Sequence, residues 1–296
     1  MELFSPRHRP PATPSASDGA PQWPMSVAAF LAGNFLRRAD VVLTRKHHDV
    51  LSWFIRWATR GKFSHAALVF LVPHQEAGFN NTFVIEAARE GVGLTNLFAY
   101  LNDRRSVVGI KRLNQPWFDD EIQCIVRGRL LNSIKSPYSY ATVMRIARGV
   151  IDQVLYGIRQ RVTGPERALN ARLRRDLPVP NAFICSGLVQ LGFLNSLSEL
   201  VHQGRLQPHA LADVIFDPKL APLLDNTNWA KHGAAEQSEI VWDTVTGFAD
   251  VLAAITPEEL ASTPKLEWIY VVRAGMVYPV QSDVDAGRLL DWEPSG

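Results

Sequence analysis

The feature that most constrains the fold is a pair of short apolar segments in the first third of the chain. Residues 64–72 read SHAALVFLV and residues 82–88 read TFVIEAA, so both are dense in residues that favour β-strands. The loop between them is polar and contains Gly78 and the pair Asn80 and Asn81, which are typical of turns. Two strands this close in sequence predict a β-hairpin.

One acid and one base lie within this hairpin. If it closes symmetrically, positions that sum to 151 face one another, which makes His65 and Glu86 cross-strand partners on one face. A carboxylate in that place can fix the tautomer of the imidazole and stabilise an imidazolium. A shift of one residue would move Glu86 to the other face, and a hydrogen-bonded structural histidine is the alternative interpretation of His65.

The rest of the chain mixes strand and helix patterns without an internal repeat. Further strands are expected at 40–44, 91–94, 106–113 and 268–272. Helices are expected from Met25, over 47–61, over 118–133, over the Arg-rich stretch 145–175 and from Cys185.

Composition and charge exclude several classes of protein. The 31 Lys and Arg residues against 29 Asp and Glu leave a net charge of +2, far from the concentrated positive field that nucleic-acid binding needs. No run of about 18 apolar residues could cross a bilayer as a helix. The two cysteines, Cys124 and Cys185, cannot build a disulfide framework and lack the CxxC spacing of a zinc site.

The N-terminal residues 1–24 are rich in Pro, Ser and Ala, which predicts a disordered tail. This segment lacks the apolar core of a secretory signal, so a cytoplasmic location is the default expectation. The chain also lacks GxGxxG, GxxxxGK[ST], HExxH and GxSxG motifs. We therefore expect neither a cofactor nor a metal.

Cys185 stands at the predicted start of a helix, ICSGLVQLGFLNSL. The amide N–H groups and the dipole at a helix N-terminus stabilise a thiolate and lower the pKa of the thiol. The same N–H groups can hold an oxyanion. The alternative is a small buried apolar residue, which is also the interpretation we favour for Cys124.

Seven segments, taken in order, resemble a known family. They are Asp40–Leu43, the helix with Phe54 and Ile55, Ser64–Ala66, Val84–Ala87, Gly91–Val92, Ser136–Tyr140 and Cys185–Val189, and residues 256–264 resemble a turn near the end of such domains. The series resembles the permuted papain-like NlpC/P60 hydrolases of the YaeF/YiiX type, in which His and Glu precede a late Cys-Ser. The resemblance spans roughly residues 38 to 272.

The resemblance implies an α+β fold of the permuted papain type, in which a small antiparallel sheet carries His65 and Glu86 and packs on the helix of Cys185. Cys185 would be the nucleophile, His65 the general base and later acid, and Glu86 the residue that orients His65. The further candidates for substrate binding or oxyanion stabilisation are Ser64, Tyr138, Tyr140 and Ser186.

The implied domain covers residues 25–275, with helical insertions at about 141–180 and 196–255 and a C-terminal extension at 276–296. Cys185 is followed by Ser-Gly where the family often has Ser-Glu, and this departure concerns the pocket and the substrate more than the triad.

The implied activity is hydrolysis of an amide, by an amidase or a peptidase, through a thioester acyl-enzyme. Two alternatives remain open: a lipid acyl hydrolase or acyltransferase of the same fold, and a non-catalytic binding module. Substrates would be a peptide, a peptidoglycan fragment or a lipid. Trp53 and Trp57 with Arg56 and Arg60 suggest peripheral membrane contact, although burial of one Trp and exposure of the other is the expectation we prefer.

Overall fold

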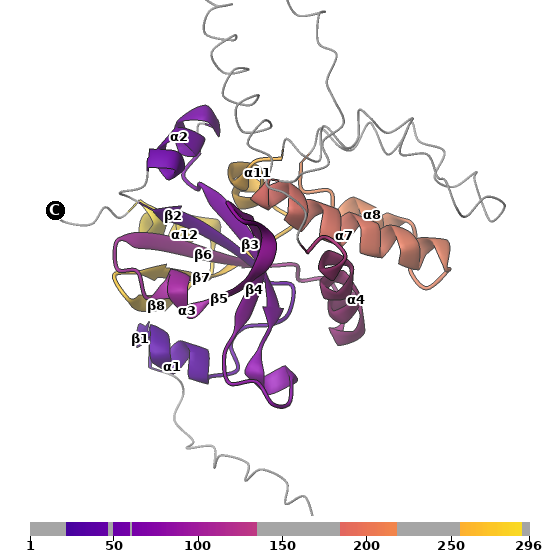
Figure 1. The fold of residues 1–296 in the computed structure, drawn as a ribbon, viewed down its shortest axis with the longest axis horizontal. Coiled ribbons are helices and arrows are strands. Elements are labelled where there is room, and N and C mark those ends of the chain that lie inside the picture. The colour runs from indigo at the N-terminus through magenta and orange to yellow at the C-terminus, as the bar shows by residue number, and fades with distance from the viewer. Residues whose placement is uncertain (1–21, 47–49, 60, 135–183, 218–254, 292–296) are drawn as a thin grey trace, which may run out of the picture.

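The computed structural model describes residues 22–46, 50–59, 61–134, 184–217 and 255–291. Its centre is an antiparallel sheet of eight strands in the order β1-β8-β7-β6-β2-β3-β4-β5 (Figure 1). The strands are β1 (Met25–Ser26), β2 (Val41–Lys46), β3 (His65–Leu71), β4 (Phe83–Ala88), β5 (Gly91–Asn96), β6 (Ser106–Arg112), β7 (Glu267–Arg273) and β8 (Met276–Pro279). The predicted α+β class is confirmed.

Helices cover both faces of this sheet (Figure 1). The described helices are α1 (Val27–Ala32), α2 (Val50–Thr59), α3 (Phe98–Leu101), α4 (Asp120–Leu131), α7 (Cys185–His202), α8 (His209–Asp213), α11 (Pro257–Ser262) and α12 (Asp283–Leu290), with the short 3-10 helix η1 (Pro73–Gln75). Helix α7 packs against β3, β4 and α4, whereas α1 and α3 lie on the other face. None of the helices within these ranges is long and apolar enough to span a membrane.

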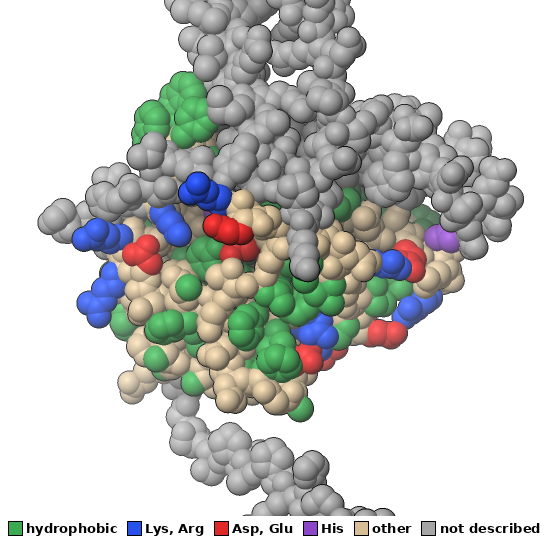
Figure 2. Space-filling view, in the orientation of Figure 1, with side chains coloured by type: hydrophobic (Ala, Val, Ile, Leu, Met, Phe, Trp, Pro, Cys, Tyr) green, Lys and Arg blue, Asp and Glu red, His purple; other side chains and the backbone are tan. Residues whose placement is uncertain are grey.

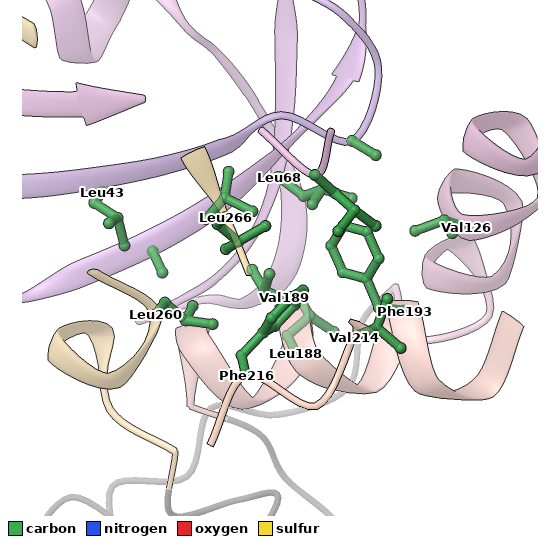
Figure 3. Packing of buried hydrophobic residues seen from close by; sticks show 14 of the residues in the cluster. Leu43, Leu68, Val126, Leu188, Val189, Phe193, Val214, Phe216, Leu260 and Leu266 are labelled. Carbon is green, nitrogen blue, oxygen red and sulfur yellow. The ribbon is translucent and has the colours of Figure 1, made fainter. Parts of the chain in front are cut away.

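Alternate residues of the central strands divide the core into two layers. Leu43 and Leu68 belong to the cluster that contains the apolar side chains of α7, and Figure 3 shows this packing from close by. Val42 and Ala67, one position earlier in each strand, belong to the cluster that contains α1 and α3. This period of two explains why the central strands are apolar along their whole length, because both of their faces are covered.

Local sequence signals fix where two of the helices, α4 and α11, begin. Asp119 caps α4, because its carboxylate accepts a hydrogen bond from the backbone N–H of Ile122 at 3.0 Å. Helix α11 begins with a capping box, in which Thr256 and Glu259 each accept a hydrogen bond from the other's backbone N–H.

The predicted hairpin is confirmed as β3 and β4, but its register differs from the expected one. Leu68 pairs with Ile85 and Val69 with Val84, so the facing positions sum to 153 rather than 151, and the register shifts again before Leu71. This difference of two residues shifts Glu86 along β4 relative to His65, but it leaves both side chains on the same face of the sheet. His65 and Glu86 are therefore diagonal neighbours instead of directly facing partners.

Described residues at both ends of the expected domain take part in its packing and its sheet. Trp23, placed in the predicted tail of residues 1–24, packs its ring at 5.3 Å from Phe35 and 5.6 Å from Tyr270, whereas residues 1–21 lie outside the described ranges. The segment expected to form an extension from 276 contributes β8, which pairs with β1 and β7. Helix α7 runs to His202, past the expected start of the second insertion. The domain limits themselves stay a prediction.

Candidate active site

Three reactive side chains from three elements meet beside the central strands. His65 is the first residue of β3, Glu86 lies in β4, and Cys185 is the first residue of α7. The apolar face of α7 packs on β3 and β4, and this packing fixes the N-terminus of the helix next to His65. Residues that are far apart in sequence are thus assembled by the fold.

Cys185 is almost fully buried, with 3% of its surface exposed. Ile184, the N-cap residue of α7, makes no side-chain capping hydrogen bond. The backbone N–H groups of Ala66 and Ser186 instead donate to the Cys185 sulfur. Both the N–H groups and the helix dipole favour the negatively charged thiolate.

Cys185 and His65 are in hydrogen-bond contact, and each shifts the pKa of the other. Burial alone would raise the pKa of the Cys185 thiol, but the charge of His65 and its hydrogen bond to the sulfur lower it below the ordinary value. Burial likewise acts to lower the pKa of His65, yet the Cys185 thiolate and then Glu86 raise it to about 10. Both shifts favour a thiolate beside an imidazolium over the neutral pair.

Glu86 lies on the other side of the imidazole ring. Its Oε2 atom is 2.5 Å from His65 Nε2, which leaves Nδ1 as the ring nitrogen that faces Cys185. Burial would raise the pKa of Glu86, but hydrogen bonds from His65, Thr95 and Tyr100 and the charge of His65 lower it to about 2. Glu86 is ionised and can stabilise the imidazolium.

Two of these partners, Thr95 and Tyr100, were not anticipated from the sequence. The Thr95 hydroxyl donates to Glu86 Oε1, and the Tyr100 hydroxyl donates to Glu86 Oε2. The Tyr100 ring also stacks on the His65 ring, with centroids 5.9 Å apart and planes 15° from parallel. A signal for Thr95 exists, because the predicted strand at 91–94, continued to 95, places it near Glu86, whereas Tyr100 arrives from α3 and carries no local signal.

The remaining candidate residues differ in their placement. The Ser64 hydroxyl donates to the Thr44 carbonyl at 3.2 Å, and the Ser186 hydroxyl donates to the Ile255 carbonyl at 2.5 Å. Both hydroxyls are thus used in internal contacts, and the part of Ser186 that meets the sulfur is its backbone N–H. Tyr138 and Tyr140 lie outside the described residues.

In the part of the chain that the structure describes, no three His, Cys, Asp or Glu side chains are grouped so that they could hold a metal ion. Comparison with known sequences adds no assignment, since no protein-family model matches the chain and no curated protein matches it significantly. The geometry of the site therefore carries the functional argument.

The chemistry available to this arrangement is that of an activated cysteine. A thiolate at a helix N-terminus is a nucleophile, an imidazolium in hydrogen-bond contact with it is a proton donor, and a buried carboxylate holds the ring. These three roles together are the minimum for acyl transfer through a covalent thioester.

Proposed function

We propose that this protein is a cysteine hydrolase that cleaves an amide bond, as an amidase or a peptidase, with Cys185 as nucleophile, His65 as acid and base, and Glu86 as the orienting residue. The observation that carries the proposal is the Cys185–His65–Glu86 chain of contacts, in which the thiol pKa is lowered and the imidazole pKa is raised to about 10. The order of these residues in the sequence, with the resemblance to permuted papain-like hydrolases, supports the same assignment and the finer fold.

In the first half of the proposed reaction, the Cys185 sulfur attacks the acyl carbon and a carbon–sulfur bond forms. The N–H groups at the start of α7 stabilise the oxyanion. The imidazolium of His65 then gives its proton to the leaving nitrogen as the carbon–nitrogen bond breaks, so an amine departs and a thioester remains.

In the second half, neutral His65 takes a proton from water, and the resulting hydroxide attacks the thioester. A carboxylic acid is released, Cys185 returns as a thiolate, and His65 again carries the proton. Glu86 stays ionised throughout and holds the ring by its bond to Nε2.

An amide substrate fits the protonation state of the site. An amine is a poor leaving group unless it is protonated as it departs, and His65 with a pKa of about 10 carries that proton over the whole physiological range. The same chemistry on an ester would make the protein a lipid acyl hydrolase or acyltransferase, and two exposed tryptophans on α2 favour this second candidate.

The first experiment measures activation of the thiol without any substrate. In a Cys124→Ser background, Cys185 is the only cysteine, so the rate of alkylation by iodoacetamide reports on it alone. We expect this rate to remain high well below the ordinary thiol pKa, and His65→Ala to restore an ordinary thiol titration. A wild-type profile equal to that of a free thiol would contradict the proposal and favour the binding-module interpretation.

The second experiment tests acyl transfer. Incubation with activated p-nitrophenyl esters and p-nitroanilides of acyl groups should give a transient mass increase on the peptide that contains Cys185, with release of the chromophore. Cys185→Ala is the control and should show neither signal. A preference for anilides over esters of the same acyl group, relative to their reactivity with free thiolate, would support the amidase assignment.

A further inference from the structure

Helix α2 carries two tryptophans that have no place in the core. Trp53 is 58% exposed and Trp57 is 43% exposed, so the expectation that one of them is buried is wrong. Their rings stack on each other with centroids 6.4 Å apart. Hydrophobic side chains project from the body of the protein where Figure 1 places α2, and Figure 2 shows them.

The tryptophans occupy one face of the helix because they are four residues apart. The helix is attached through a different residue, Ser52, which is buried. The Ser52 hydroxyl lies 3.1 Å from the Lys46 carbonyl and 2.5 Å from the Ser64 hydroxyl. The aromatic face is therefore directed away from the contacts that hold the helix on the sheet.

The charged side chain within α2 is basic, whereas Asp49 precedes the helix in the sequence and the Glu258 carboxylate lies at Gly61 after it. Residues 50–59 include Arg56 and no carboxylate, and Lys46, which is exposed, precedes the helix. Tryptophan prefers the boundary between lipid headgroups and acyl chains, because its ring is apolar and its indole N–H can still form a hydrogen bond. Basic residues beside such an aromatic face complement anionic headgroups.

We propose that α2 docks the protein on the surface of an anionic lipid bilayer, with Trp53 and Trp57 inserted at the headgroup boundary and Arg56 and Lys46 near the lipid phosphates. This docking goes beyond the proposed hydrolase activity and does not depend on it, since none of the four residues belongs to the triad.

The docking surface is connected to the site by a short path. Ser52 of α2 contacts Ser64, and Ser64 immediately precedes His65 at the start of β3. The aromatic helix and the reactive cysteine are thus attached to the same end of β3. Docking through α2 brings this end of the sheet to the membrane, which would present membrane-borne acyl substrates to Cys185.

The test is flotation of the full chain with vesicles of phosphatidylcholine that contain phosphatidylglycerol. We expect the wild type to float and the double variant W53A/W57A to lose about tenfold or more in apparent affinity. Vesicles of phosphatidylcholine alone should bind the wild type more weakly, and Arg56→Gln should reduce the difference between the two vesicle types.

The matched control is Phe79→Ala, which removes another exposed aromatic side chain, 49% exposed, from the loop beyond the other end of β3. This variant should float as the wild type does. Trp53, Trp57 and Phe79 are exposed and Arg56 is partly exposed, so the variants are expected to keep the fold, and an unchanged melting temperature verifies that.

Several results would overturn the docking proposal. They are absence of wild-type flotation, equal flotation of W53A/W57A and the wild type, and a loss of flotation that is as large for Phe79→Ala. Loss of a dimer in sedimentation of W53A/W57A, without a change in flotation, would instead assign the face to a second copy of the chain. Cys185→Ala should float normally, so failure of the hydrolase proposal is distinguishable from failure of docking.

Discussion

At the scale of single residues, the carboxylate of Glu86 is held from three directions. Oε2 accepts hydrogen bonds from His65 Nε2 and from the Tyr100 hydroxyl, and Oε1 accepts one from the Thr95 hydroxyl. An ionised carboxylate can only accept, so both hydroxyls must donate. Burial and the charge of Glu86 raise the pKa of Tyr100, which keeps its proton in place.

We expect Tyr100→Phe to disfavour the thiolate–imidazolium pair without breaking the fold. Loss of one donor raises the pKa of Glu86, weakens its hold on the imidazolium and thereby raises the pKa of Cys185. In the Cys124→Ser background, the acid-side midpoint of the plot of Cys185 alkylation rate against pH should shift to a higher pH by about one unit. The measurement is the alkylation rate as a function of pH.

Two further variants separate this effect from general destabilisation. Thr95→Val removes the donor to Oε1 and should move this midpoint in the same direction, whereas Tyr278→Phe, on β8, should leave it in place. The parent protein, Cys124→Ser, must first show an activated Cys185 thiol. If Tyr100→Phe then has the same dependence of alkylation rate on pH as this parent, Tyr100 fills space and does not position Glu86.

The residue scale also shows where sequence reasoning succeeds. His65 and Glu86 come together because a hairpin brings neighbouring segments into contact, and its faces follow from the strand period of two. The predicted contact between His65 and Glu86 is present although the predicted register was wrong, because an error of two residues leaves Glu86 on the same face of the sheet. Tyr100 was missed because it reaches Glu86 from a four-residue helix, a placement that no periodicity encodes.

At the scale of elements, the position of Cys185 depends on how closely α7 approaches α4. A Cβ atom added at Gly192 of α7 would lie 2.7 Å from Cδ2 of Leu130, which is a buried residue of α4. The glycine is thus required by the close crossing of the two helices. The apolar pattern of each helix was visible in the sequence, but the crossing was not.

We expect Gly192→Ala to destabilise the protein by about 1–3 kcal/mol, because overpacking outweighs the gain in helix propensity. The matched control is Gly128→Ala in α4, where an added Cβ meets nothing within 4 Å. That variant should be neutral or more stable by up to about 1 kcal/mol. Urea denaturation of both variants measures the difference, and equal effects would contradict the close crossing.

The elements that sequence predicted well are those with a dense run of strand-forming residues or a helical apolar period. Strands at 106–113 and 268–272 were expected and are β6 and β7, and the helix over 118–133 is α4. Their pairing across more than 150 residues was not predictable, since β6 meets β7 only because both bury apolar faces in the same core. β8 instead joins the sheet locally, because it follows β7 after a tight turn at Ala274 and Gly275 and pairs with it, and only its pairing with β1 is non-local.

At the scale of the whole molecule, α11 ties the Cys185 helix to the rest of the structure. The carbonyl before it, of Ile255, accepts from the Ser186 hydroxyl, and Glu258 accepts from the Lys62 backbone at 2.6 Å. Lys111, 1% exposed, donates to the carbonyls of Ala261 and Thr263 at the other end of the helix. Burial lowers the pKa of Lys111 to about 8, against weaker attraction from Asp283 and Glu258.

The lowered pKa of Lys111 predicts how stability depends on pH. Between pH 8 and 10.5 the unfolded chain holds a proton on this lysine that the folded chain has released. The contribution of Lys111 to the free energy of unfolding therefore rises between pH 8 and 10.5, by up to about 3 kcal/mol. We expect the free energy of unfolding of the wild type, relative to Lys111→Met, to increase from pH 8 to 10.5.

The relative measurement removes the opposite contribution of His65. Its folded pKa is raised to about 10, so its stabilisation is complete below pH 6.5 and is lost as the pH rises through 10, but both proteins carry it. Urea denaturation at a series of pH values gives the difference. A gap that stays constant or narrows between pH 8 and 10.5 would show that Lys111 titrates normally in the folded protein.

The pairing of β1 with β8 has a consequence for the order of events during synthesis. His65, Glu86 and Tyr100 emerge from the ribosome long before Cys185, and the sheet gains its last strands only after residue 267. The strand at the N-terminal side, β1, therefore cannot pair until residues 276 and 277 have been synthesised. Closure of this edge of the sheet is therefore a late and non-local step of folding.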